Sequence, residues 1–396
     1  MAVKTNVKKA ALTGNTAVAI AMKQINPDVY PAYPITPSTA IIEDFAGFVA
    51  DGSVDTELIT VESEHSAMSA CIGASAAGAR VMTATSSQGL ALMWEMLYIA
   101  SGMRLPIVIA DVNRALSAPI NIHCDHSDSM GARDSGWLQL YAETVQEAYD
   151  NVFMAMRIAE NENVMLPAMV CMDGFITSHA IENLDLLSDE EVRGFVGEYK
   201  GKNSLLDTDN PVTWGAMVLQ DHYITFKHQQ SEAMTKAKDV AVGVMKEFGE
   251  KFGRQYGVID AYRLEDADAA IVIMNSAAGT TKVVVDELRT QGKKVGVLRL
   301  RMFRPFPFKE IADALRGVKA VAVLDRADSM NAFGGPIFNE LRSALYDLDN
   351  RPKVMSRIYG LGGRDYKVKD AVEVFEELLN ISKTGKIETL TKYITL

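Results

Sequence analysis

Cysteine is scarce in this sequence. Only three cysteines occur in 396 residues, Cys71, Cys124 and Cys171, and no two of them form a C-x-x-C pair. A four-iron cluster takes about four thiolates, so a cluster held by this chain alone is excluded. A disulfide framework has no support either, which indicates a reducing compartment, and we expect the chain in the cytoplasm.

An excess of positive charge and long apolar runs are also missing. Lysine and arginine number 40 against 51 aspartates and glutamates, which gives a formal net charge of −11. Such a chain lacks the basic patch that binds nucleic acid or a membrane surface. No apolar run reaches the roughly 18 residues of a membrane span. Residues 1–15 contain no long apolar stretch, so we expect no secretory signal.

Three motifs of common enzyme classes are absent as well. The sequence contains no G-x-S-x-G nucleophile elbow and no G-x-x-x-x-G-K-[ST] phosphate-binding loop. None of its glycine-rich turns is a G-x-G-x-x-G that opens a helix. Hydrolase, kinase and dinucleotide-binding functions therefore lose their main support.

Strand–helix alternation is the strongest feature that is present. Hydrophobic residues make up 48% and charged residues 23%, an ordinary mixture for a globular protein. Apolar strand-like runs alternate with helical segments over residues 28–114 and again from about residue 266, which predicts parallel α/β sheets. We therefore expect a larger domain over residues 1–260, with a helical connector near 230–256, and a smaller α/β domain over 261–396.

The expected elements can be placed by their sequences. The strands of the first domain are VYPAYPI, ELITVESE, RVMTATS, LPIVIADVNR and NVMLPAMVCMDG, and its helices include residues 13–25, capped by Thr13 or Asn15, and LALMWEMLYIASGM. In the second domain, the strands AAIVIMNS, KVGVLRLRMF, KAVAVLDR and KVMSRIYGLGG alternate with helices near 280–291, 308–316, 335–348 and 368–383. Residues 65–80 are rich in Ala, Ser and Gly, which favours close packing either inside the core or at a subunit interface.

Polar residues cluster where four strands of the first domain end. In open parallel sheets, ligands bind beyond the carboxyl ends of the strands. Those ends carry the runs Pro34-Ile35-Thr36-Pro37, Val61-Glu62-Ser63-Glu64, Thr85-Ser86-Ser87-Gln88-Gly89 and Asp111-Val112-Asn113-Arg114. Together they offer hydroxyl, carboxylate, amide and guanidinium groups, a set that suits a small anionic substrate.

Two of these residues have a functional and a plain structural interpretation. Arg114 can clamp a carboxylate with its planar fork, or it can form an ordinary surface or interface salt bridge. Glu64 follows a strand and begins a helix, whose N-terminus favours the ionised carboxylate, or it is simply an acidic helix start. Glu62, two residues earlier, competes for any role of Glu64.

The densest polar run is Asn121-Ile122-His123-Cys124-Asp125-His126-Ser127-Asp128. Histidine, cysteine and aspartate are all zinc ligands, so a zinc site is one interpretation. The run lacks a second pair of ligands elsewhere, and it follows a strand as a loop. A loop that orders the active site, or one that contacts a partner, is the alternative that we favour, and we expect no metal on this chain.

The strand-end motifs resemble those of a known family. Tyr33-Pro-Ile-Thr-Pro-Ser-Thr39, Glu62-Ser-Glu-His65, Thr83-Ala-Thr-Ser-Ser-Gln-Gly89 and Asn113-Arg-Ala-Leu-Ser-Ala-Pro119 are similar to the alpha subunits of 2-oxoacid:ferredoxin oxidoreductases, above all those acting on pyruvate (pyruvate synthases). The likeness continues through Arg301-Met-Phe-Arg-Pro-Phe-Pro307, Leu324-Asp-Arg326 and Gly360-Leu-Gly-Gly363. It thus covers nearly the whole chain in one order.

The resemblance implies a thiamine diphosphate enzyme with a pyrimidine-binding first domain and a transketolase C-terminal-like second domain. Glu64 matches the glutamate that contacts N1′ of the aminopyrimidine and promotes formation of the cofactor's ylid. Thr36 matches the threonine that hydrogen-bonds the substrate, and Arg114 the arginine that binds its carboxylate. Further cofactor contacts are assigned by the same resemblance to Pro34, Ile35, Ser87 and Gln88.

The resemblance also implies partner chains. A G-D-G motif for the diphosphate and Mg²⁺ is missing, because Asp51-Gly52 and Asp173-Gly174 lack the preceding glycine. The family places that motif and a 4Fe–4S cluster on a beta subunit, with gamma and delta subunits beside it. We expect a dimer of such heteromers that uses pyruvate and CoA and reduces ferredoxin.

Three alternatives to pyruvate oxidation remain at this stage. The chain can act on another 2-oxoacid, such as 2-oxoglutarate, a branched-chain 2-oxoacid or oxalate. A hydroxyl at Thr36, in place of a second cation, favours a monoacid over a dianion. A non-catalytic scaffold is disfavoured because Thr36, Glu64 and Arg114 occur together, and a self-sufficient thiamine enzyme is disfavoured by the missing diphosphate motif.

Overall fold

The computed structural model describes residues 8–396. Residues 1–7, about half of the segment on which the expectation of no secretory signal rests, lie outside this range. Thirteen α-helices and fifteen strands are found in the described part of the chain. None of these helices combines the length and the apolar character needed to cross a membrane.

The first part of the chain alternates strands and helices. In order, it contains β1 (Lys8–Thr13), α1 (Gly14–Ile25), β2 (Val29–Ala32), α2 (Thr39–Ala50), β3 (Glu57–Thr60), α3 (Glu64–Ala76), β4 (Met82–Thr85), α4 (Ser87–Leu92), α5 (Trp94–Gly102), β5 (Val108–Asn113), α6 (Ser127–Gly131), β6 (Leu138–Tyr141), α7 (Val145–Ala159), β7 (Ala168–Asp173), β8 (Ile181–Leu186), α8 (Asp189–Val196) and α9 (Gln220–Phe252). Thr13 caps α1 as predicted, since its side chain accepts a hydrogen bond from the backbone N–H of Thr16.

The second part repeats this alternation. It contains β9 (Ile259–Tyr262), β10 (Ala269–Met274), α10 (Ala277–Thr290), β11 (Val295–Leu300), β12 (Met302–Arg304), α11 (Phe308–Leu315), β13 (Ala320–Asp325), α12 (Pro336–Leu345), β14 (Lys353–Ile358), a 3₁₀ turn (Leu361–Gly363), α13 (Val368–Thr384) and β15 (Thr391–Tyr393). The four helices predicted here are confirmed. The mixed α/β fold with parallel sheets is confirmed as well.

The first sheet has the order β12-β6-β7-β5-β4, in which β4, β5, β7 and β6 run parallel. The parallel pair β2–β3 adjoins β4 through a bridge between Val29 and Val81, and the Thr83 hydroxyl donates to the Pro31 carbonyl at 2.7 Å. The four predicted strand ends therefore lie along one edge. β5 and β7 are fully buried, which explains why their sequences are mostly apolar.

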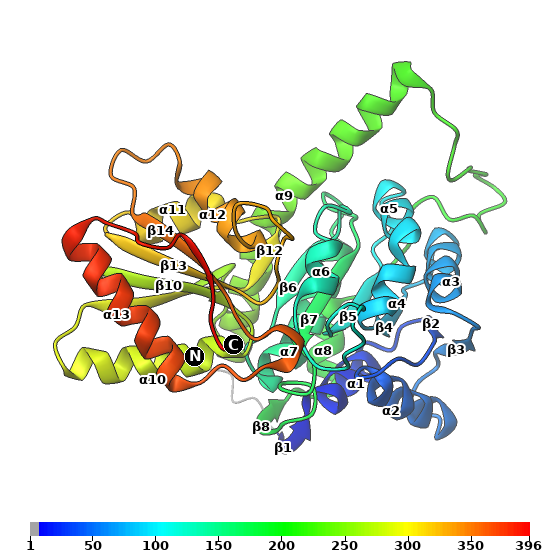
Figure 1. Ribbon diagram of the computed structural model, residues 1–396. Helices are drawn as coiled ribbons and strands as arrows, with labels where there is room; N and C mark the ends of the chain where they lie inside the picture. Colours follow the sequence, from blue (N-terminus) through cyan, green and yellow to red (C-terminus); the bar gives the residue numbers. More distant parts are fainter. Residues whose placement is uncertain (1–7) are drawn as a thin grey trace.

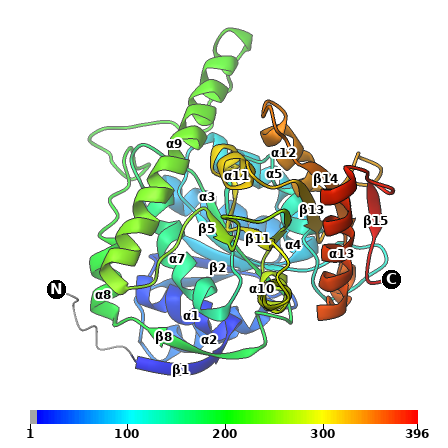
Figure 2. The same ribbon diagram turned by 90° about the vertical axis from the view of Figure 1, so that its left-hand side faces the viewer.

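The second sheet has the order β15-β14-β13-β10-β11-β9 and is parallel except for β9. Helices α10 and α13 cover one of its faces, and α11 and α12 pack on the other (Figures 1 and 2). The core between the two sheets contains residues from both halves, among them Ile109, Met169, Val272 and Phe303. The boundary expected at residue 260 falls inside β9, and the division into two domains stays a prediction.

Three sequence predictions about single elements are wrong. LALMWEMLYIASGM is not one helix, because the helix is interrupted at Met93, between α4 and α5. KVGVLRLRMF is not one strand: β11 lies in the second sheet, whereas β12 pairs antiparallel with β6 of the first. The connector helix begins at Gln220, ten residues before the predicted start at 230, because its exposed first turns lack the apolar periodicity that the prediction used.

Helix α9 packs along only part of its length. Its second half is packed, with Ala233, Ala237, Val244, Met245 and Phe248 buried. Residues 220–229 are exposed, and this end of α9 extends beyond the body of the molecule (Figure 1). The packed half therefore supplies the tertiary contacts that stabilise the helix.

Candidate active site at the edge of the first sheet

The structure brings three of the predicted strand ends into direct contact. The Arg114 guanidinium, beyond β5, donates to the Thr36 carbonyl, beyond β2, at 3.0 Å. The Ser87 hydroxyl, beyond β4, donates to the carbonyl of Ala115 at 2.6 Å. The fourth end, beyond β3, carries Glu64, which lies against Gly89 of α4. Thr36, Glu64, Ser87 and Arg114 thus gather at one edge.

Glu64 is the first residue of α3. The Ser63 side chain caps this helix by accepting from the Ser66 N–H, so Glu64 lies in the first turn, where the helix dipole favours a negative charge. The residue is only 7% exposed. No hydrogen-bond donor to its carboxylate is found within residues 8–396. The carboxylate therefore has free acceptor positions for a donor on a ligand.

Gly89 makes room for that carboxylate. A Cβ at this position would lie 2.3 Å from Thr85 Oγ1 and 2.8 Å from Glu64 Oε1. The buried hydroxyls of Thr85 and Ser86, at the end of β4, have no hydrogen-bond partner. Because buried polar groups are nearly always paired, these two hydroxyls beside the Glu64 carboxylate mark this edge as a candidate ligand site.

Arg114 is held by carbonyl oxygens and not by an acid. Its side chain donates to the carbonyls of Thr36 and Asn121, each at 3.0 Å, and the residue is 7% exposed. Within residues 8–396 it forms no ion pair, so the salt-bridge interpretation of Arg114 finds no partner there. A buried guanidinium without a counter-ion favours a bound anion, and its planar fork matches a carboxylate.

The remaining predicted residues lie around this edge with fewer contacts. The Ser87 hydroxyl also donates to Gln88 Oε1 at 2.6 Å, and Gln88 is half-buried. Pro34 and Thr36 are exposed, and Ile35 is half-buried with its carbonyl accepting from Ser38. The structure records no contact from Pro34 or Ile35 to Glu64 or Arg114. Their assigned role as cofactor contacts stays a prediction.

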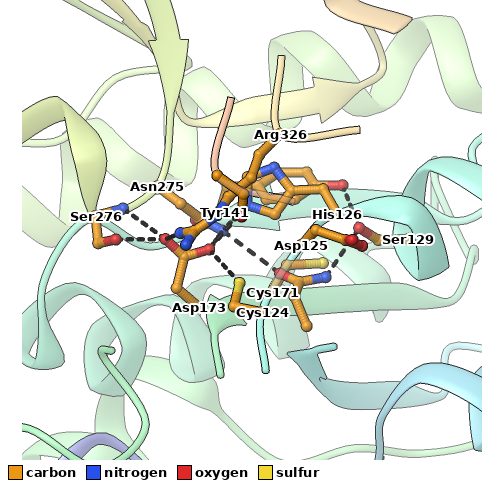
Figure 3. Close-up of polar contacts among 12 residues, drawn as sticks. Cys124, Asp125, His126, Ser129, Tyr141, Cys171, Asp173, Asn275, Ser276 and Arg326 are labelled. Carbon is orange, nitrogen blue, oxygen red and sulfur yellow. Dashed lines mark hydrogen bonds and ion pairs between the residues drawn. The ribbon is translucent and has the colours of Figure 1, made fainter. Parts of the chain in front are cut away.

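The polar run 121–128 contains a cluster with the geometry of a metal site. Potential ligand atoms of Cys124, His126 and Asp173 lie within 4.8 Å of one another, and all three residues are buried. Asp173, however, already accepts from Cys124 Sγ at 3.2 Å and contacts His126 Nε2 at 2.8 Å. Asn275 and Arg326 donate to the same carboxylate, at 3.0 and 3.1 Å (Figure 3).

The charge of Arg326 argues against a metal in this cluster. Burial acts to raise the pKa of Asp173, but Arg326 and His126 outweigh it and hold that pKa well below its usual range. The carboxylate is therefore ionised and already neutralised by a guanidinium, which would repel a metal cation. This cluster fits a hydrogen-bonded link between loops better than a zinc site.

Four polar residues at the site had no role in the sequence interpretation. Asp128 binds the backbone of two strand ends, Asn113 bridges Asp111 and Asp128, and Asp173 links the loops described above. Asp111 and Asn113 stand in a predicted strand-end run, and Asp128 ends the predicted polar run. Their residue types and positions could be read from the sequence, but their partners, up to 153 residues away, could not.

Comparisons with known proteins agree with this geometry. A protein-family model described as pyruvate flavodoxin/ferredoxin oxidoreductase, thiamine diphosphate-binding, matches residues 20–246. Another, described as pyruvate:ferredoxin oxidoreductase core domain II, matches residues 267–371. A thiamine diphosphate-binding domain fits an edge that presents an unpartnered glutamate and two unpaired hydroxyls.

Curated relatives match over nearly the whole chain. Pyruvate synthase subunit PorA of Thermotoga maritima is 56% identical and covers 94% of this chain and 95% of its own length. The PorA subunit of Methanocaldococcus jannaschii is 51% identical over 93% of this chain and 94% of its own. Ketoisovalerate oxidoreductase subunit VorA of Pyrococcus abyssi is 47% identical and covers 96% of each. These relatives are named as subunits, which indicates a multi-subunit enzyme.

Solved structures support the fold. A chain of 2-oxoglutarate:ferredoxin oxidoreductase from Magnetococcus marinus superposes with a TM-score of 0.71 at 20% identity, covering 95% of this chain and 66% of that one. A split-gene transketolase superposes with a TM-score of 0.55 at 11% identity, covering 94% and 100%. The family resemblance of the strand-end motifs is confirmed. This chain belongs to the pyruvate:ferredoxin oxidoreductase family and is a subunit of a 2-oxoacid:ferredoxin oxidoreductase.

Proposed function

We propose that this chain is the alpha subunit of a pyruvate:ferredoxin oxidoreductase. The enzyme converts pyruvate, CoA and two oxidised ferredoxins to acetyl-CoA, CO2, a proton and two reduced ferredoxins. The observation that carries the proposal is the pairing, at one sheet edge, of a nearly buried carboxylate without a donor and a buried guanidinium without a counter-ion. The first suits a cofactor that needs a proton held in place, and the second suits an anionic substrate.

Thiamine diphosphate, when bound, supplies the carbon nucleophile and the electron sink that decarboxylation of a 2-oxoacid needs. Glu64 holds a proton at N1′ of the aminopyrimidine, a task supported by its burial and its place in the first turn of α3. Thr85, Ser86, Ser87 and Gln88, which end or follow β4 beside Glu64, would contribute polar groups to the same site.

The substrate is held by two residues of this chain. The Arg114 guanidinium binds the carboxylate of pyruvate, and the Thr36 hydroxyl donates to a substrate oxygen. Because Arg114 also donates to the Thr36 carbonyl at 3.0 Å, the two residues are fixed relative to each other. Such fixed placement lowers the entropic part of the barrier.

The remaining parts of the enzyme belong to partner chains. All three cysteines of this chain are buried as free thiols, and burial raises the pKa of each, so none is available for a cluster. We assign the diphosphate, Mg²⁺ and a 4Fe–4S cluster to a beta subunit, and gamma and delta subunits carry electrons onward to ferredoxin. Heteromers of this kind pair into dimers in the cytoplasm.

Small residues of α3 support a partner on one face. Ala67, Met68, Cys71 and Ile72 pack inside, as the internal-packing alternative required. Gly73 is exposed, and Ser66, Ser69, Ala70 and Ala74 are partly exposed on the other face of the helix. Internal packing thus holds for the inner face, and the partly exposed outer face is the one that we propose for a subunit.

A branched-chain 2-oxoacid is the second candidate substrate. The VorA relatives, which are named for ketoisovalerate, are as similar to this chain as several PorA relatives are, at 46–47% identity. Both substrates carry one carboxylate and one keto group, so Arg114 and Thr36 serve either. The choice depends on the space around the alkyl group.

The deciding experiment uses the complex purified with its natural partner chains. Reduction of a viologen dye is measured with CoA and, in turn, pyruvate, ketoisovalerate and 2-oxoglutarate. We expect the highest kcat/KM with pyruvate and no turnover by this chain alone with added thiamine diphosphate. A higher value with ketoisovalerate would replace the substrate, and turnover by the isolated chain would contradict the assignment of partners.

A further inference from the structure

Asp128 is a buried carboxylate that holds two strand ends of the site at once. Its Oδ2 accepts from the backbone N–H of Ser87 at 3.0 Å and from that of Arg114 at 2.8 Å. Its Oδ1 accepts from Asn113 Nδ2 at 3.0 Å and from the N–H of Ser129 at 2.8 Å. Asp128 itself lies on α6, so one side chain ties three separate segments together.

These contacts lie just beyond the ends of β4 and β5, where the backbone no longer forms hydrogen bonds to neighbouring strands. Ser87 lies two residues beyond β4 and has a φ of 49°, a left-handed conformation that costs a residue with a Cβ about 1–2 kcal/mol. Arg114 is the first residue beyond β5. Neither N–H has a partner from a neighbouring strand, so Asp128 supplies the bond that fixes each turn.

The charge on Asp128 strengthens the bonds. Four N–H donors surround the carboxylate, and hydrogen bonds to an ionised acceptor are roughly twice as strong as neutral ones. Burial, and then the charge of Asp128, raise the pKa of neighbouring Asp111 well above its usual range. Burial also raises the pKa of Asp128, to about 6, against the effect of its donors. Since a pKa of about 6 lies below 7, Asp128 is mostly ionised at neutral pH.

We propose that Asp128 is a positioning residue of this enzyme: its carboxylate sets the backbone from which Arg114 reaches the substrate and the Ser87–Gln88 turn reaches the cofactor. The inference rests on the proposed function, because the placement of Arg114 and Gln88 has consequences only when they meet ligands. A buried acid with a merely structural role would affect unfolding but would leave the Michaelis constant unchanged.

The test substitutes Asp128→Asn in the reconstituted complex. The amide has one oxygen for four donors and turns its own N–H groups towards the others, so one strand end is released. Because a displacement of about 1 Å can cost about 100-fold in rate, we expect kcat/KM for pyruvate to fall about 100-fold, with KM raised at least about tenfold. The thiamine diphosphate concentration for half-maximal rate rises as well.

Asp125→Asn is the matched control. Asp125 is a buried acid of the same loop that accepts from the backbone of Ser127 and Gly362 but touches neither strand end. This variant is expected to lower the unfolding temperature while KM stays within about threefold of the wild-type value. The same pattern in a folded, assembled Asp128→Asn complex would overturn the proposal.

A second variant covers the case in which Asp128→Asn fails to assemble. Asp128→Glu keeps the charge and moves it by one methylene, so the complex should form with KM raised at least about threefold. An unchanged KM in this variant would overturn the proposal. If the wild-type complex itself turns over no 2-oxoacid, the proposed function fails; if the wild type is active and both variants match it, only the positioning role fails.

Discussion

At the scale of single residues, the site needs a glycine, which has no side chain, as much as it needs its acidic and basic side chains. Gly89 is the clearest case, because any Cβ there would meet Thr85 Oγ1 and Glu64 Oε1 well inside normal contact distance. The glycine lies in α4, where alanine would otherwise be the better helix former. Space for Glu64, and not backbone freedom, therefore explains the glycine.

Gly89→Ala should accordingly displace the Glu64 carboxylate. We expect activity of the reconstituted complex to fall at least about tenfold, with an overpacking cost of about 1–3 kcal/mol in the free energy of unfolding. Gly243→Ala in α9 is the matched control, since a Cβ there meets nothing within 4 Å. It should keep full activity and stabilise the helix slightly. Equal activities of the two variants would mean that Gly89 makes no room for a reacting group.

The sequence could predict the acids and bases of the site but not the residues that hold them. Glu64, Arg114 and Ser87 follow strands directly, and the carboxyl-end rule gathers such residues without knowledge of contacts. Asp128 was visible only as the last residue of a polar loop. Its function depends on reaching back 41 residues to Ser87, which no local pattern encodes.

At the scale of elements, one buried ion-pair network joins α7 to the second sheet. Glu147 of α7 accepts from Arg299 of β11 at 2.7 and 2.9 Å and from Arg301 at 2.5 Å. Burial acts against the charge of Glu147, but Arg301 and Arg299 outweigh it and lower its pKa to about 2. Arg301, which the resemblance included in a family motif, here serves as a structural anchor.

This network predicts a defined loss of stability in acid. An acid whose pKa drops on folding stabilises the folded state above its unfolded pKa of 4.5, and this contribution disappears as pH falls towards 2. The drop corresponds to about 3 kcal/mol. In urea unfolding, wild type should exceed Glu147→Gln by about that much at pH 7, and the gap should close below pH 3.

Glu250→Gln on the exposed face of α9 is the control for this series, because Glu250 forms only a surface pair with Lys246 at 3.7 Å. Its stability should stay within about 0.5 kcal/mol of wild type at every pH. A gap between wild type and Glu147→Gln that is equally wide at pH 7 and pH 3 would show that the charge of Glu147 contributes nothing.

Elements were predictable where local patterns and tertiary packing agree. The fully buried strands β5, β7, β10 and β13 were found because burial on both faces makes their sequences apolar almost throughout. β12 was missed as a separate strand because apolar residues continue past Arg301, so the sequence shows no boundary after β11. Its pairing with β6 depends on the path of the chain in space, which the sequence does not show. The first turns of α9 were missed because nothing packs on them.

At the scale of the whole molecule, the carboxyl ends of strands from both sheets meet at Asp173. Asp173 is the last residue of β7. Its carboxylate accepts from Asn275, beyond β10 and 102 residues away in sequence, and from Arg326, beyond β13 and 153 residues away (Figure 3). The loop bearing Cys124 and His126 joins the same carboxylate. Through Asp173, the second half of the chain therefore holds the loop 121–128. This loop carries Asp128 and contacts Arg114.

The small number of cysteines bears on how the whole enzyme is assembled. The three thiols are buried, and the polar edge of the first sheet offers groups for only one part of a thiamine site. We infer that the other half comes from partner chains. The central claim is that this chain contributes the carboxylate on which the cofactor's reactivity depends, and that this carboxylate is Glu64.

The most direct measurement compares Glu64→Gln with Glu62→Gln in the reconstituted complex. Glu62 is exposed and accepts only from the Ser66 hydroxyl, at 2.9 Å, so it is a charge-matched neighbour outside the site. We predict that 2-oxoacid-dependent dye reduction falls at least about 100-fold in Glu64→Gln and stays within about threefold of wild type in Glu62→Gln, with both complexes fully assembled. Wild-type turnover by an assembled Glu64→Gln complex would contradict the central claim.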